Sequence, residues 1–102
     1  MRPEYILKLD INGRQLNRVI IEQHYKKKHA RSINDQLILE LVKELNEGVF
    51  TIEEQHGEFQ YFTVDLVWKN NKAYRLILLL CIAEKYLGVI NAFRINRRKY
   101  HG

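Results

Sequence analysis

The segment from residue 24 to residue 31 is the part of the sequence best suited to acid/base chemistry. It carries two histidines and four basic side chains without an acidic residue: His24, Lys26, Lys27, Lys28, His29 and Arg31. An imidazole exchanges protons readily near neutral pH because its unperturbed pKa is about 6.5. Neighbouring cations can stabilise the charge of a phosphate group. The segment therefore predicts proton transfer beside a bound phosphate.

A second basic segment lies near the end of the chain and would supply further phosphate ligands. It contains Arg94, Arg97, Arg98 and Lys99, followed by Tyr100. Outside the eight basic residues of the two segments, nine basic side chains face twelve acidic ones, a net charge of −3 in a chain of net charge +5. This segregation indicates a local site for a polyanion. The alternatives are a solvated surface that aids solubility and, for residues 97–100, a disordered tail.

Cleavage of RNA without a metal ion uses these side-chain types. A base removes the proton of the 2′-hydroxyl, an acid protonates the leaving 5′-oxygen, and cations surround the pentavalent phosphate. The candidate catalytic residues are His24, Lys28, His29 and Tyr100, and the candidate RNA-binding residues are Lys26, Lys27, Arg31, Arg94, Arg97, Arg98 and Lys99. Such a site exists only if the two basic segments, far apart in the sequence, meet in the fold.

Structural roles stay open for several of these residues, and metal chemistry is disfavoured. His24 precedes an aromatic residue and could be a partly buried hydrogen-bonding group, whereas Arg94 alternates with apolar residues as a polar-face strand residue would. His56 lies beside a glycine and is typical of a turn. Cys81, the one cysteine, lies in an apolar run and is predicted to be a buried small hydrophobe. Without an HExxH motif or thiolates and carboxylates at ligand spacing, the sequence predicts no metal and no cofactor.

A hairpin and a short helix are expected to position the first basic segment. Asn12-Gly13 is a dipeptide that tight turns favour, so residues 5–20 are predicted to form a β-hairpin. Residues 21–29 lose the alternating pattern and predict a short helix, in which His24 and Lys28 would lie on one face.

A longer helix is expected to follow as scaffold. Ser32 or Asn34 would cap its first turn, and Gly48 would end it. Its apolar residues recur at helical spacing and would face the core: Leu37, Ile38, Leu41, Val42 and Leu45.

The remainder of the chain has the composition of a β-sheet. Four strands are predicted, over residues 49–54, 58–68, 74–83 and 86–95, as antiparallel neighbours with short connections. Arg75 interrupts an apolar strand, so it should pair with Asp65 or face the cleft, since an unpartnered buried charge is costly. The expected fold is α+β: an N-terminal hairpin and two helices, then a four-stranded, mainly antiparallel sheet with the longer helix on one face.

Length and composition indicate one folded domain over residues 1–102. Its expected parts are a hairpin (1–20), a helical part (21–47), a sheet (49–95) and a basic tail (96–102). The sequence shows neither an apolar run long enough to span a bilayer nor an apolar signal segment at its start, so we expect no membrane association and a cytoplasmic site of action.

The order of these features resembles a known superfamily of small ribonuclease toxins. The residues that carry the resemblance are His24 with a basic residue four positions on, His29, the INDQLILELV helix, and the strand YLGVINAFR that runs into a basic tail. They are similar to the barnase, EndoU, colicin and RelE (BECR) superfamily, especially its compact RelE-type and DUF4258-type members. The resemblance implies His24 and His29 as acid/base residues, with Arg94, Arg97 and Tyr100 holding phosphate or donating a proton. The N-terminal hairpin and the very apolar central strand depart from that pattern.

Two functions follow as alternatives. The first is a metal-independent endoribonuclease toxin that acts on RNA and is held inactive by a cognate antitoxin or immunity protein. The second is a non-catalytic module that uses the basic surface to bind nucleic acid or an acidic protein. Affinity in the second case would fall steeply with salt, because it would depend mainly on counterion release.

Overall fold

The N-terminal hairpin belongs to the main sheet of the protein. The computed structural model describes residues 2–95. Strands β1 (Glu4–Ile11) and β2 (Arg14–Ile21) are antiparallel, and Asn12 and Gly13 turn the chain between them with positive φ angles, as the dipeptide predicted. β2 then pairs in parallel with the last strand, β6 (Tyr86–Ile95).

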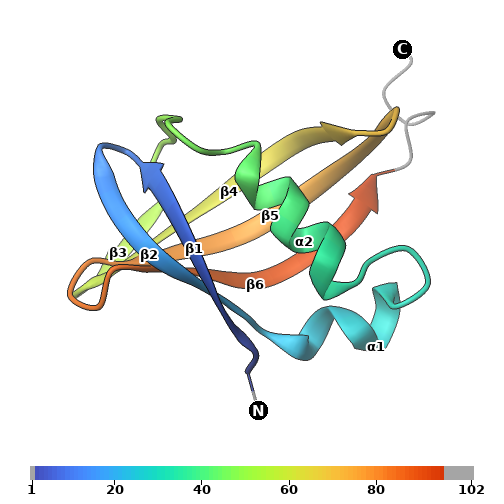
Figure 1. Cartoon of the computed structure of the whole chain (residues 1–102), viewed down its shortest axis with the longest axis horizontal. Helices are drawn as coiled ribbons and strands as arrows, with labels where there is room; N and C mark the ends of the chain where they lie inside the picture. Colours follow the sequence, from blue (N-terminus) through green and yellow to red (C-terminus); the bar gives the residue numbers. More distant parts are fainter. Residues whose placement is uncertain (1, 96–102) are drawn as a thin grey trace.

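Six strands form one curled, half-barrel sheet in the order β1-β2-β6-β5-β4-β3 (Figure 1). β3 (Glu54–His56), β4 (Phe59–Lys69), β5 (Lys72–Cys81) and β6 are successive antiparallel neighbours. The predicted α+β fold with a four-stranded sheet is therefore wrong, because the protein is mostly β with a mixed sheet. The physical reason is the parallel pairing of β2 with β6, which requires a long crossover and leaves no local sequence signal.

The helix predicted over residues 21–29 is also shorter and split. β2 continues to Ile21, and a 3-10 turn, η1 (Gln23–Tyr25), leads into a single α-helical turn, α1 (Lys26–His29). His24 therefore lies in the 3-10 turn and Lys28 in α1, so the single helix that was predicted to carry both on one face does not form.

The longer helix, α2 (Asp35–Lys43), begins at the predicted cap Asn34. The side-chain Oδ1 of Asn34 accepts a hydrogen bond of 2.8 Å from the backbone N–H of Leu37. Ser32, the other predicted cap, instead donates from its hydroxyl to the carbonyl oxygen of His29 at 3.5 Å. The helix ends several residues before Gly48, and Glu47 rather than Gly48 has a positive φ, of 67°.

α2 crosses one face of the curled sheet and closes the core (Figure 1). Its buried residues Ile38, Leu41 and Val42 join one apolar cluster with alternate residues of β5, among them Leu76 and Leu78. The intervening residues of β5, from Arg75 to Leu79, point to the opposite face and are half-buried. We call that face the second face of the sheet. Within residues 2–95, none of the helices has the length and hydrophobicity needed to cross a membrane.

Candidate functional site

The end of β2 places the first basic segment beside the C-terminal half of β6. The parallel register pairs Ile21 with Val89, and the N–H of Glu22 donates to the Val89 carbonyl oxygen at 2.9 Å. β2 stops there, whereas β6 continues to Ile95. η1 and α1 lie along this remaining part of β6, and Figure 1 shows α1 on the same side of the molecule as the end of that strand. The first basic segment is thus brought next to the strand that leads into the second.

A cluster of four side chains forms where α1 meets the second face. The imidazole of His29 stacks on the ring of Phe93, with 5.3 Å between ring centroids and 27° between the planes. The guanidinium carbon of Arg75 lies 5.6 Å from the centroid of the same ring. Arg75 also forms an ion pair with Asp65, with 3.2 Å between Nε and Oδ1. We call His29, Phe93, Arg75 and Asp65 the His29 cluster.

The His29 cluster combines a titratable group, a cation and an aromatic surface. The side chain of Arg75 is 34% exposed and that of Asp65 is 78% exposed, so solvent or a ligand can reach the ion pair. An arginine against an aromatic ring contributes a cation–π attraction and holds both groups in place. A phosphate beside such an arginine would compete with Asp65 for the guanidinium.

Three side chains that converge on Asp35 hold the first basic segment in position. Asp35, the first residue of α2, accepts a 2.7 Å hydrogen bond from the Tyr5 hydroxyl on β1 and a 2.6 Å bond from the Tyr25 hydroxyl in η1. The side-chain amide of Gln23 also donates to it, at 3.3 Å. One carboxylate therefore links β1, η1 and α2, and it fixes the point where the chain leaves the sheet towards α1.

Titration of these groups reflects the same contacts. Burial alone would raise the pKa of Asp35, but the hydrogen bonds from Tyr25, Tyr5 and Gln23 outweigh it and hold the pKa below its usual value. Burial, followed by the hydrogen bond to Asp35, raises the pKa of Tyr25. The hydrogen bond to Asp35 is the main reason that the pKa of Tyr5 is raised. At neutral pH the network is therefore a carboxylate held by two neutral phenols.

The predicted site residues differ in where they lie relative to the His29 cluster. The structure brings His29 into the cluster, while the other members of the first basic segment are exposed: His24, Lys26, Lys27, Lys28 and Arg31. Arg94 pairs in register with Tyr74 and so lies on the α2 face, opposite to Phe93 and Arg75. The remaining predicted residues lie outside the described residues: Arg97, Arg98, Lys99 and Tyr100.

Sequence reasoning missed Phe93 but had a signal for Arg75. The lone charge in an apolar strand predicted that Arg75 would pair with Asp65 or face the cleft, and the structure has the ion pair with Asp65. Phe93 looked like an ordinary strand residue, because no local pattern shows which aromatic ring a distant histidine will contact.

Two further features lie away from the His29 cluster. A cleft of about 560 Å³ is lined by the start of β2, by Glu47 and by Lys85, at the opposite end of β2 and β6 from α1. Glu58, Cys81 and Glu84 also come together at the start of β6, with ligand atoms within 4.8 Å of one another. These three residues are the described side chains best able to hold a metal ion.

Comparisons with protein families, with curated proteins and with solved structures give no match for this chain.

Proposed function

We propose that this protein is an endoribonuclease that cleaves RNA by acid/base chemistry at the His29 cluster without using a metal ion. The observation that carries the proposal is the stacking of His29 on Phe93, because it joins the first basic segment to the strand that leads into the second. The resemblance to ribonuclease toxins, found in the sequence, agrees with this assignment. By the same resemblance, the proposed biological setting is cytoplasmic RNA as substrate and a cognate antitoxin or immunity protein as inhibitor.

In the proposed reaction His29 takes one of the two proton-transfer roles. The 2′-hydroxyl loses its proton to a base, its oxygen attacks the adjacent phosphorus, and the leaving 5′-oxygen receives a proton from an acid. The products are a 2′,3′-cyclic phosphate and a 5′-hydroxyl. His24, Lys28 and Tyr100 remain candidates for the second role. Arg75, together with the exposed lysines of the first basic segment, would stabilise the pentavalent phosphate.

The second face of the sheet offers a surface for the RNA strand on either side of that phosphate. Ile77 and Asn91 are half-buried register partners next to the Arg75 and Phe93 pair, and Tyr61 and Leu79 form the next pair on this face towards β4. Aromatic side chains stack on unpaired bases and contribute about 1–3 kcal/mol per base. The expected substrate is therefore single-stranded RNA rather than a duplex.

A variant that keeps the stacking but removes the titratable group tests the proposal. His29→Phe preserves an aromatic ring against Phe93, so RNA binding should change little. The cleavage rate should fall about 10²- to 10⁴-fold, the usual contribution of a positioned acid or base. His56→Ala is the matched control, because His56 is an exposed histidine paired with Glu54 on β3.

The assay uses a single-stranded RNA oligonucleotide in the presence of EDTA, with a 2′-deoxy version as the uncleavable control. Analysis of the products should find a 2′,3′-cyclic phosphate, since the 2′-hydroxyl is the nucleophile. Full cleavage by His29→Phe would remove His29 from the mechanism. Intact RNA at every concentration of the unaltered protein would overturn the proposal as a whole.

A second candidate function, binding of nucleic acid without cleavage, is favoured by the placement of Arg94. A cleaving site benefits from phosphate ligands on one face, yet Arg94 and Arg75 lie on opposite faces of the sheet. For a protein that only binds, cations on both faces and on α1 would still attract a polyanion. Such a protein would bind the RNA and its 2′-deoxy version with similar salt dependence and leave both intact.

A further inference from the structure

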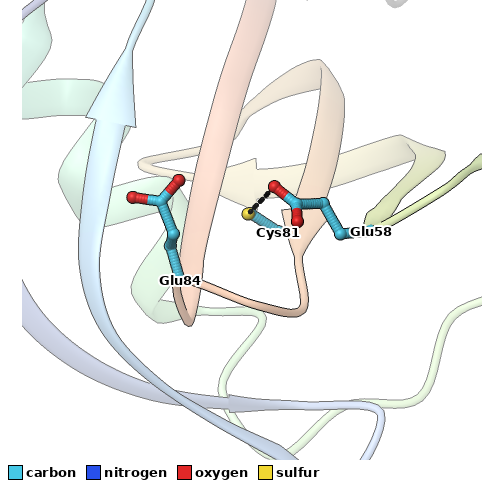
Figure 2. Close-up of side chains that lie close together, drawn as sticks. All are labelled: Glu58, Cys81 and Glu84. Carbon is cyan, nitrogen blue, oxygen red and sulfur yellow. Dashed lines mark hydrogen bonds between the residues drawn. The ribbon is translucent and has the colours of Figure 1, made fainter.

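The turns at the other end of the sheet bring a buried thiol against two carboxylates. Glu58 lies in the turn between β3 and β4, Cys81 is the last residue of β5, and Glu84 lies in the turn between β5 and β6. Figure 2 shows the sulfur of Cys81 between the two glutamate side chains, with a dashed hydrogen bond to the carboxylate of Glu58. The thiol donates to Oε1 of Glu58 at 3.7 Å, and the ligand atoms of all three residues lie within 4.8 Å of one another.

The backbone fixes these three residues in place. The N–H of Ile82 donates to the carbonyl oxygen of Glu58 at 2.9 Å, which attaches the β3–β4 turn to the end of β5. Cys81 pairs in register with Tyr86 on β6 and is completely buried. Cys81 is thus buried, as the sequence predicted, while its sulfur lies within reach of two surface carboxylates.

The geometry points to a binding site for a thiophilic divalent cation, of the Zn²⁺ type, formed by Cys81, Glu58 and Glu84. Zn²⁺ accepts one sulfur and two carboxylate oxygens in a tetrahedral set with a water as the fourth ligand. Ligand atoms around tetrahedral Zn²⁺ lie about 3.5 Å apart, given its bond lengths of about 2.0–2.3 Å. The two glutamates are exposed at turns, so rotation of their side chains can close the set around the ion.

Charge around the site agrees with a cation. Two carboxylates and a thiolate carry three negative charges, and Arg18 neutralises part of them by contacting Oε1 of Glu84 at 3.3 Å. Arg18 also contacts Glu4, at 2.8 Å, and lies over the ring of Tyr86. A carboxylate has two oxygens, so Glu84 can bind Arg18 and the ion together. On binding, the thiol proton passes to solvent as the metal–sulfur bond forms.

The site is separate from the proposed chemistry. Cys81 pairs with the first residue of β6, whereas Phe93 lies seven residues further along that strand, roughly 20 Å away at the rise of an extended chain. A bound ion would fasten the β3–β4 turn and the β5–β6 turn to each other. Loss of this site would therefore leave the His29 cluster in place, and the two proposals can fail independently.

The single cysteine makes the test specific. Cd²⁺ added to the metal-free full chain should produce an ultraviolet thiolate-to-cadmium charge-transfer band that saturates at one ion per chain, and only Cys81 can give this band. Zn²⁺ should displace the Cd²⁺ and raise the Tm. Cys81→Ser should abolish the band, and the double variant Glu58→Gln/Glu84→Gln should weaken binding at least tenfold.

A double variant with the same loss of charge serves as the control. Glu44→Gln/Glu53→Gln changes two exposed glutamates elsewhere and should bind Cd²⁺ as the unaltered chain does. The absence of a band at excess Cd²⁺ would reduce the cluster to a thiol–carboxylate hydrogen bond. Equal affinity in the Glu58/Glu84 double variant would mean that the thiol alone captures the metal. Either outcome overturns the proposal.

Discussion

Replacement of Tyr25 by phenylalanine removes one oxygen atom, yet it should destabilise the protein strongly. The Tyr25 side chain is 1% exposed, and its hydroxyl donates to Asp35 at 2.6 Å. A hydrogen bond to a charged group contributes about 1.5–3 kcal/mol. Tyr25→Phe should therefore lower the free energy of unfolding by about 2 kcal/mol, which for a domain of this size corresponds to a fall in Tm of about 10 °C.

The matched variant removes the second phenol from the same carboxylate. The Tyr5 side chain is half-buried and donates to the other oxygen of Asp35 at 2.7 Å. Because water can replace this donor, Tyr5→Phe should cost about 1 kcal/mol, a smaller loss than for Tyr25. Denaturant unfolding followed by circular dichroism measures both values, and a double-mutant cycle with Asp35→Ala isolates each bond.

The effect of Tyr25→Phe should depend on pH in a defined direction. The pKa of Asp35 is lowered in the folded protein, so its contribution to stability is present above its unfolded value of about 3.9 and is lost as the pH falls through the lower folded value. The difference between the unaltered protein and Tyr25→Phe should therefore be full at pH 7 and shrink below about pH 4. An equal difference at pH 7 and pH 3, or no difference at pH 7, would refute this account of the network.

Two further predictions concern the helix cap and the basic segment. Asn34→Ala removes the bond to Leu37 and should cost about 1 kcal/mol in denaturant unfolding, whereas Ser32→Ala should change stability by less than about 0.5 kcal/mol; equal losses would reassign the cap. Lys27→Gln should weaken binding of single-stranded RNA and lower the slope of log affinity against log salt by about 0.7; an unchanged slope would place the phosphates elsewhere.

The sequence was most informative where a structure depends on neighbouring residues. The hairpin at Asn12-Gly13, the cap at Asn34 and the apolar stripe of α2 all follow from short-range rules, and each is present. The ion pair between Arg75 and Asp65 was also predictable, because a charge in an apolar strand needs a partner. Such features depend on the hydrophobic pattern and the conformational propensity of a few neighbouring residues.

Contacts between distant segments account for what the sequence did not reveal. Nothing near Ile21 indicates that this residue lies opposite Val89 in a parallel pair, so the hairpin was expected outside the sheet. The three residues of the Cys81 site come from two turns and the end of β5, and they share no spacing motif. In the same way, His29 was a candidate from its basic surroundings, but its stacking on Phe93 depends on how the sheet closes.

The unequal lengths of β2 and β6 explain why the His29 cluster forms where it does. β2 ends opposite Val89, and the last six residues of β6 would present an unpaired strand edge if the chain turned away. η1 and α1 cover that edge instead, and Asp35 fixes them there through Tyr25 and Gln23. A change that lengthens β2 by one residue pair with β6 should therefore move His29 away from Phe93 while the core under α2 stays intact. A change that removes a hydrogen bond to Asp35 should do the same. A measurement of the His29 ring resonance in Tyr25→Phe tests this link, because the ring-current shift from Phe93 should decrease in the folded variant.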